Sequence, residues 1–288
     1  MIMEMTDSPT KLKEWAQLFR IRTFEMIKRR GNGHWGGSAS AADLLTALYF
    51  NFLKIDHTRP GLEDRDRMVL SKGHAAPILY QILSEKGFFH SDELDGFRTK
   101  GSILQGHPCM NETPGVDMST GALGHGVSVG LGMALASKLK KIKNYTVVLI
   151  GDGDLNEGET WEGIMASAKF KPEGLIFLID FNQVQLDGPS SQVMPMEPLQ
   201  EKLRAFNVNV MDITVDGHSS DQILESFDWI KKQDQWPVAV VYKTIKGKGI
   251  SFTENNYKWH GAQIDDISYT NGMKELQSEY NRIKKIEL

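Results

Sequence analysis

The sequence of 288 residues has only one cysteine, Cys109, so it cannot form an intrachain disulfide framework. It has no apolar run near the roughly 20 residues that span a bilayer, and MIMEMTDSPTKLKEW at the N-terminus lacks the apolar core of a signal peptide. Neither sign of charge dominates, since 33 Lys and Arg stand against 37 Asp and Glu. A nucleic acid or an anionic membrane is therefore not expected as a partner. We expect a soluble, cytoplasmic globular protein.

Segments with helical spacing alternate with short apolar runs, which is the pattern of an α/β protein. The helical segments are KLKEWAQLFRIRTFEMIKRRG, ASAADLLTALYFNFL, AAPILYQILSEKG and ALGHGVSVGLGMALASKLKK. The strand-like segments are YTVVLI, LIFLID, NVMDITV and PVAVVYKTI. Because these strands are almost continuously apolar, we predict a parallel sheet flanked by helices on both faces. We expect a single domain over residues 1–288, in which residues from about 251 to 288 form a loop and then a helix.

A Gly-Asp-Gly turn, Gly151-Asp152-Gly153, follows the strand YTVVLI. Ligands of open parallel sheets bind beyond the carboxyl ends of the strands, and glycine lets a ligand approach the backbone closely. The next segment, NEGETWEGIMASAKF, predicts a helix whose first amides favour an anion. A carboxylate beside a phosphate requires a cation between them, and Mg²⁺ is commonly bound in this way. The alternative is an ordinary turn, in which Asp154, Glu157 and Glu159 are helix-start charges.

A second strand, LIFLID, ends in polar residues at Asp180-Phe181-Asn182, and 28 residues from Asp154 to Phe181 separate the turn from Asn182. Here the sequence resembles the thiamin-diphosphate enzymes, whose motif is Gly-Asp-Gly, a spacer of just under thirty residues, and Asn. The resemblance implies that Asp152, Asn182 and the carbonyl of Val184 hold Mg²⁺ or Ca²⁺ on the cofactor's diphosphate. The general motif often ends in Asn-Asn, whereas Phe181 precedes a single Asn here.

Half of the eight histidines lie in glycine-containing turns, where a rigid scaffold can present functional side chains. These four are His34 in GNGHWGG, His74 in LSKGHAAPILY, His107 in LQGHPC and His260 in KWHGAQ. We interpret three others as surface or hydrogen-bonded core residues: His57, His90 and His218. The eighth, His125, either supports the site or simply begins a helix.

Taken in order, GHWGGSASAADLLTALY, VLSKGHAAPILYQIL, TGALGHGVSVGLGMALASK, the GDG–Asn pair and YKTIKGKG with WHGA resemble the N-terminal, diphosphate-binding part of transketolases. The resemblance covers roughly residues 11–263. It implies a thiamin-diphosphate-binding fold and the transfer of a two-carbon ketol (glycolaldehyde) unit from a ketose phosphate or related ketose to an aldose.

The resemblance also implies roles for individual residues. Those expected to face the donor ketose are His34, His107 and His260. Those expected at the cofactor are His74, Gly121, Leu123, Gly151, Asp152, Gly153, Asn182, Leu186 and His260. Glu157 matches a glutamate at the subunit interface of the family.

Three further residues invite functional readings. Cys109 lies near the expected site, but nothing in its sequence context activates it, so we expect an inert thiol. Lys246 and Lys248 in TIKGKG either contact phosphate or belong to a solvated turn, and we expect the solvated turn.

Transketolases continue into a pyrimidine-binding domain, which carries the glutamate that activates the cofactor, and into a third domain. We therefore expect this chain to be the N-terminal subunit of a split transketolase that works with a separate C-terminal subunit, with two copies of each (α2β2). Pentose phosphates, a branched sugar phosphate and a sulfonated deoxy-sugar all stay open as substrates. The alternatives are a 1-deoxyxylulose-5-phosphate synthase, a 2-oxo acid dehydrogenase α-subunit, and a non-catalytic protein that binds thiamin diphosphate.

Overall fold

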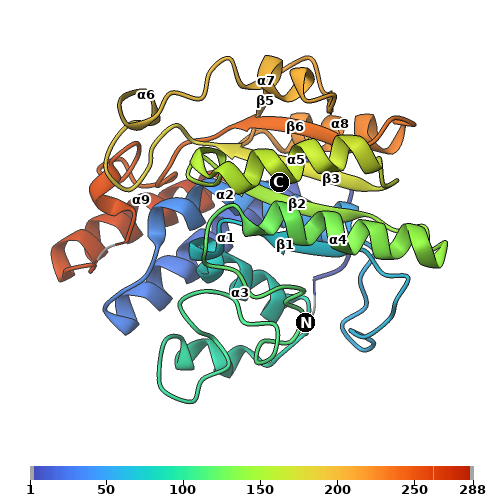
Figure 1. Cartoon of the computed structure of the whole chain (residues 1–288). Helices are drawn as coiled ribbons and strands as arrows, with labels where there is room; N and C mark the ends of the chain where they lie inside the picture. Colours follow the sequence, from blue (N-terminus) through green and yellow to red (C-terminus); the bar gives the residue numbers. More distant parts are fainter. Residues whose placement is uncertain (1–2, 262, 286–288) are drawn as a thin grey trace.

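The computed structural model describes residues 3–261 and 263–285 (Figure 1). Within these residues, a sheet of six parallel strands forms the centre of the fold. The strands are β1 (Arg67–Leu70), β2 (Thr146–Gly151), β3 (Leu175–Phe181), β4 (Asn209–Val210), β5 (Val215–Asp216) and β6 (Val238–Lys243). Their order is β1-β2-β3-β6-β4. The short strand β5 also pairs with β6, at residues further along β6 than those paired with β4.

Helices cover both faces of the sheet. They are α1 (Pro9–Arg30), α2 (Trp35–Ala47), α3 (Ala76–Glu85), α4 (His125–Lys140), α5 (Gly158–Phe170), α6 (Ser190–Val193), α7 (Leu199–Ala205), α8 (Ser220–Lys231) and α9 (Asp266–Lys284). Shorter helical segments are η1 (Leu48–Phe52), η2 (Gly73–Ala75), η3 (Ser91–Gly96), η4 (Asp154–Asn156) and η5 (Tyr257–Trp259). No helix in the described ranges is long and apolar enough to cross a membrane.

Successive residues of the buried strands pack against opposite layers of helices. In β2, Val147 and Leu149 join the core formed with α1, α2, α3 and α8, whereas Val148 and Ile150 join the core under α4, α5 and α7. Figure 1 shows α4 and α5 lying across one face of the sheet, with α1 and α2 on the other. Because a side chain alternates between faces at each strand residue, such strands must be apolar throughout. The predicted fold class is confirmed.

Two strand predictions need correction. The segment NVMDITV was predicted as one strand, but it forms β4 and β5, which pair with opposite ends of β6 at Asn209–Val238 and Val215–Tyr242. The chain bends at Asp212 and Ile213 between the two strands, which interrupts the ladder. β1 was not predicted, because its four residues follow the charged run LEDRD and are too short to show a period. β1 pairs with β2 and forms one edge of the sheet.

The ends of the helices follow the sequence signals. The Ser8 hydroxyl accepts a hydrogen bond from the Lys11 amide (3.3 Å) and caps α1. Gly31 ends α1 in the left-handed conformation, with φ of 69°. At the other end of the chain, α9 packs along α1, so that Leu276 and Ile250 share a small core with Phe24.

Candidate active site

The loops that follow β1, β2, β3 and β6 enclose a cavity of about 260 Å³ at one edge of the sheet. The strands end in register there, since Gly151 pairs with Asp180 and Phe181 pairs with Lys243. The lining residues are His34, Gly37, Lys72, His74, His107, Gly121, Leu123, Gly151, Asp152, Gly153, Asp154, Asn182, Val184, Gln185, Leu186, Asp187, Lys246 and His260. The cavity therefore brings together all four histidines of the glycine-containing turns and the Gly-Asp-Gly turn.

The four histidines form one cluster, although they come from separate segments of the chain. The ring of His34 lies with its centre 5.6 Å from that of His74, 5.7 Å from His107 and 5.5 Å from His260. The rings of His74 and His260 are 4.8 Å apart. His34 precedes α2, His74 lies in η2, and His260 follows η5, so tertiary folding alone creates the cluster.

These imidazoles are neutral near pH 7. Burial is the main cause that lowers the pKa of His34 to about 4 and that of His260 to about 3. Burial likewise lowers the pKa of His74 well below its ordinary value, and burial followed by the charge of Arg98 lowers that of His107. A neutral imidazole can accept a proton at one nitrogen and donate from the other. The cluster therefore offers hydrogen-bonding and proton-transfer groups without competing positive charge.

An unpaired carboxylate oxygen lies at the edge of the cavity. Asp152 is 3% exposed, and its Oδ2 atom accepts a hydrogen bond from the Gln183 amide (2.8 Å). Its Oδ1 atom is buried and has no partner within residues 3–261 and 263–285. Burial, and then the charge of Asp180, raises the pKa of Asp152 to about 7. A buried oxygen without a hydrogen-bond donor is costly, and it indicates a place for a ligand.

The donor atoms at this edge suit a hard cation. Asp152, the amide of Asn182 and the carbonyl of Val184 offer only oxygen ligands, which Mg²⁺ and Ca²⁺ prefer. No cluster of three His, Cys, Asp or Glu side chains with metal-binding geometry occurs in the part of the chain that the structure describes. These three oxygen donors are compatible with a cation that takes its remaining ligands from a bound molecule.

Lys246 is the largest surprise of the site. It is only 2% exposed, and its Nζ atom donates to the carbonyls of Val184 (2.8 Å) and Gln185 (3.0 Å) and lies 2.8 Å from Nδ1 of His260. Burial, and then the charge of Lys72, lowers the pKa of Lys246 to about 7. The solvated turn expected for Lys246 is therefore wrong. Lys248 is partly exposed, and its ammonium lies 3.4 Å from Glu254.

A second buried cation stands below the cavity. The ammonium of Lys72 pairs with the carboxylate of Asp180, and both side chains are buried. Hydroxyl groups of Ser40 (2.7 Å) and Thr244 also donate to Asp180. Because Asp180 balances the charge of Lys72, the ammonium of Lys246 is the group that can attract an anionic ligand to the cavity.

The carboxylate of Asp154 is occupied by hydrogen bonds within the protein. It accepts hydrogen bonds from the Ser71 hydroxyl (2.5 Å) and from the amides of Gly124 (2.9 Å) and Gly151 (2.9 Å). It therefore joins the loops after β1 and β2 to the loop that carries Gly121 and Leu123. The sequence suggested only a helix-start charge at this position.

Two glycines make the close packing of the site possible. An added Cβ atom at Gly37 would lie 2.8 Å from Nε2 of His74. At Gly36 it would lie 2.9 Å from the carbonyl of Trp259 and 3.0 Å from the Lys246 side chain. The turn GHWGG therefore needs small residues for its neighbours to reach the cavity.

The remaining predicted residues lie at the rim or outside. Leu186 lines the cavity but is 59% exposed. Glu157 is exposed at the start of α5 and does not line the cavity. His125 begins α4, and its Nε2 atom lies 3.2 Å from Glu159. Cys109 is partly buried and is not a lining residue.

Comparison with known proteins places this site in a family. A model described as "Transketolase, thiamine diphosphate binding domain" matches residues 12–281. The chain is 39% identical over 275 residues to the 6-deoxy-6-sulfo-D-fructose transketolase subunit of a Clostridium species, covering 96% of this chain and 99% of the relative. It is 37% identical over 266 residues to an apulose-4-phosphate transketolase subunit of Phocaeicola vulgatus, covering 92% and 94%.

Among solved structures, the crystal structure of transketolase from Campylobacter jejuni is similar, with a TM-score of 0.85 and 28% identity. The similarity covers 94% of this chain and 45% of that one. The chain belongs to the transketolase family and contains its thiamine diphosphate-binding domain. It spans less than half of the full-length enzyme, whereas it matches nearly the whole length of the two separate subunits. The family resemblance of the motifs is confirmed.

Proposed function

We propose that this chain is the N-terminal, cofactor-binding subunit of a split transketolase, which transfers a two-carbon ketol unit from a ketose donor to an aldose acceptor. The observation that carries the proposal is the Oδ1 atom of Asp152, unpaired within the described residues, in a cavity shared with four neutral histidines. Diphosphate binding accounts for the carboxylate and for His74 and His260, and substrate chemistry accounts for His34 and His107 and for a second role of His260.

The residues around the cavity divide between the parts of the cofactor. Asp152, Asn182 and the Val184 carbonyl hold Mg²⁺ or Ca²⁺ on the diphosphate. His74 and His260 would contact the diphosphate through their side chains, and Gly153 would do so through its backbone amide in the turn that also contains Gly151. The groups that line the ring portions of the cofactor are Gly121, Leu123 and Leu186.

When bound, thiamin diphosphate supplies a carbon nucleophile that adds to the ketose carbonyl. The protein groups then handle protons on the sugar. His34 and His260 would assist removal of the proton from the donor C3 hydroxyl, His34 as the acceptor of the proton and His260 as a hydrogen-bond donor, and His107 would hold the C1 hydroxyl. The lowered pKa of His34 keeps its imidazole neutral, and so able to accept that proton, at neutral pH.

The tautomer of His260 supports its role. In its protonated form, Lys246 donates to two carbonyls with two of its three N–H bonds, and the third is directed to Nδ1 of His260. A neutral His260 that accepts at Nδ1 carries its own proton on Nε2. This leaves Nε2–H as the donor that His260 offers to the diphosphate or the sugar.

A second chain completes the site in this proposal. The pyrimidine-binding part of a transketolase, with its activating glutamate, comes from a separate C-terminal subunit in an α2β2 assembly, and Glu157 lies at the interface between subunits. Relatives of this length are named as subunits, which supports a two-chain enzyme. Their names include 6-deoxy-6-sulfo-D-fructose and apulose-4-phosphate. We therefore propose a ketose phosphate or a sulfonated ketose as donor, pentose phosphates included, and a cytoplasmic location.

The direct test is ketol transfer by the two subunits separately and by their mixture. We expect no transfer by either one on its own and full transfer after mixing in the presence of thiamin diphosphate and Mg²⁺. Full activity of the 288-residue chain by itself contradicts the proposal, as does an inactive mixture across phosphorylated and sulfonated ketoses.

A further inference from the structure

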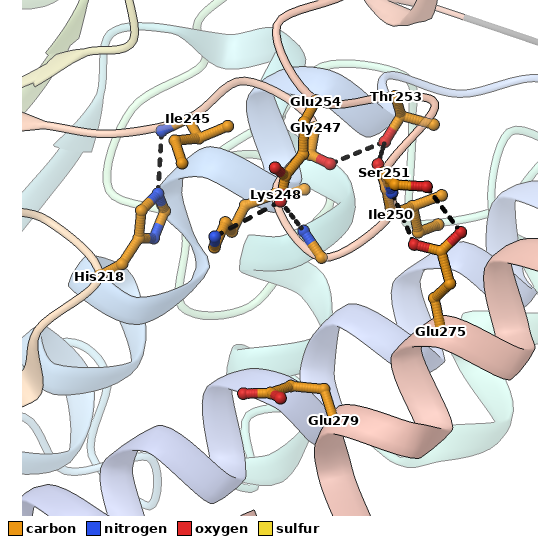
Figure 2. A network of polar contacts seen from close by, with 12 residues as sticks. His218, Ile245, Gly247, Lys248, Ile250, Ser251, Thr253, Glu254, Glu275 and Glu279 are labelled. Carbon is orange, nitrogen blue, oxygen red and sulfur yellow. Dashed lines mark hydrogen bonds and ion pairs between the residues drawn. The ribbon is translucent and has the colours of Figure 1, made fainter. Parts of the chain in front are cut away.

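One segment carries Lys246 into the cavity. We call residues 244–256, which follow β6, the strap (Figure 2). Lys246 is the strap side chain that lines the cavity, where it contacts the Val184 carbonyl and His260. A small displacement of the strap would therefore change the distance of the Lys246 ammonium from the Val184 carbonyl, a proposed metal ligand, and from His260, a proposed substrate contact.

Most anchors of the strap lie beyond Lys246 in the chain. The Gly247 amide donates to the Gly36 carbonyl (3.0 Å), and Glu275 of α9 accepts from the amide (2.7 Å) and the hydroxyl (2.9 Å) of Ser251. Figure 2 shows the Ser251–Glu275 contacts on one side of the strap and His218 on the other. The anchor immediately before Lys246 is the hydrogen bond from the Ile245 amide to Nε2 of His218 (2.9 Å).

The protonation of His218 follows from its two partners. Because the Ile245 amide can only donate, Nε2 of His218 must accept, and the neutral ring then carries its proton on Nδ1. Nδ1 lies 2.7 Å from Oδ2 of Asp43, to which it donates. Asp43 is buried and is held in turn by the guanidinium of Arg20. His218 therefore links a fixed buried carboxylate to the backbone of the strap.

The turn that presents His218 is fitted closely to the strap. An added Cβ atom at Gly217 would lie 2.4 Å from the Thr244 side chain. The Gly217 amide donates to the Lys243 carbonyl (2.9 Å), and the His218 amide donates to Asp216 (2.9 Å). The Gly217 turn therefore packs on Thr244, and the His218 ring bonds to Ile245, the residue before Lys246.

We propose that His218 is a positioning residue for the cofactor site: by accepting from the Ile245 amide, with Asp43 orienting its ring, it fixes the strap so that the Lys246 ammonium lies against the Val184 carbonyl and His260. His218 touches neither cofactor nor substrate and acts through Lys246. This inference rests on the proposed function, because the effect it predicts is on thiamin diphosphate binding.

Two substitutions to amide side chains distinguish the contributions of the two ring nitrogens of His218. The side chain of Gln reaches the place of Nε2, so His218→Gln keeps an acceptor for Ile245. The side chain of Asn reaches only the place of Nδ1, so His218→Asn keeps the contact to Asp43 but loses the hydrogen bond from the Ile245 amide of the strap. In the reconstituted two-chain enzyme with Mg²⁺, we expect His218→Asn to weaken thiamin diphosphate binding about 5- to 10-fold, the range of one lost hydrogen bond. We expect His218→Gln to change it less than about 2-fold.

A double-mutant cycle identifies the route of the effect. In a Lys246→Met background, His218→Asn should cause no further loss of cofactor affinity, because the group it positions is gone. The matched control is His90→Asn, because His90 is exposed and does not line the cavity. This substitution should leave the affinity for thiamin diphosphate unchanged. Thermal unfolding of each variant reports general stability, which a merely structural role of His218 would change equally in both backgrounds.

The outcomes are distinct. Equal cofactor affinity of the His218→Asn and His218→Gln enzymes overturns the inference, as does an undiminished effect of His218→Asn in the Lys246→Met background. A wild-type assembly that binds no thiamin diphosphate contradicts the proposed function itself and removes the inference with it. If His218→Asn fails to fold, amide exchange at Ile245 in the wild-type enzyme decides: protection must increase on cofactor binding, because coupling is reciprocal, and unchanged protection overturns the inference.

Discussion

The Nζ atom of Lys246 lies 2.8 Å from the carbonyl oxygen of Val184, in the same cavity as the Oδ1 atom of Asp152, which is unpaired within residues 3–261 and 263–285. In this part of the chain, a buried ammonium and a buried carboxylate thus line one cavity without forming an ion pair. A ligand that carries both signs of charge, as a diphosphate with a divalent cation does, would stabilise the charged forms of both groups. The following predictions test parts of this arrangement.

Asp152→Asn should abolish metal-dependent cofactor binding. The substitution keeps the size of the side chain but removes the charge that holds the cation, so we expect thiamin diphosphate affinity to fall more than about 100-fold, beyond the range of an outer-shell loss. Titration of the cofactor into the two-chain enzyme with Mg²⁺ measures this. Retention of wild-type affinity would show that Asp152 is not a ligand.

His107→Asn should affect the sugar rather than the cofactor. His107 lies beside His34 in the cavity but is not among the groups we assign to the diphosphate. We expect turnover of the ketose to fall about 10²- to 10⁴-fold, with thiamin diphosphate and metal affinity nearly unchanged. Parallel losses of turnover and cofactor affinity would show that this division of roles is wrong.

In the chain purified without thiamin diphosphate, His34 should lower the free energy of unfolding as the pH falls. Its folded pKa of about 4 lies below the ordinary value of 6.5, so between these values the unfolded state binds a proton that the folded state does not. The free energy of unfolding contributed by His34 is therefore full above pH 6.5, falls down to about pH 4 and then levels off. Urea unfolding at several pH values should show a shallower dependence for His34→Asn than for wild type, and equal slopes would contradict the predicted protonation.

Lys72→Met should destabilise the fold strongly. Removing one member of the buried Lys72–Asp180 pair leaves an uncompensated charge, which typically costs about 3–5 kcal/mol. Replacing both partners, as in Lys72→Met with Asp180→Leu, should cost less than the single change. The free energy of unfolding in urea distinguishes the two, and a single variant as stable as the double one would refute this view of the pair.

Much of the fold follows from the sequence, because the central strands are apolar throughout and end sharply at polar residues. The same feature located Asp152 and Asn182 at one edge. β1 and the division of residues 209–215 into two strands were missed, since four-residue and two-residue strands carry no period and exist only through pairing with β2 and β6.

The site itself was predictable where a residue's chemistry shows in its local pattern, as for His34 and His74 in their glycine-rich turns. It was not predictable for the buried lysines. Lys72 and Lys246 stand in short polar stretches that are usually solvated, and only the fold places Asp180 and the Val184 carbonyl around their ammonium groups. The two lysines lie in the motifs LSKGH and TIKGKG. Nothing local in these stretches indicates burial, which is a tertiary property.

The most direct test of the central claim is calorimetric titration of thiamin diphosphate into the reconstituted two-chain enzyme, once with Mg²⁺ and once with a chelator. If the carboxylate of Asp152 holds a cation on the diphosphate, binding is tight with Mg²⁺ and lost in the chelator. Equal binding under both conditions, or no binding with Mg²⁺, would contradict the claim.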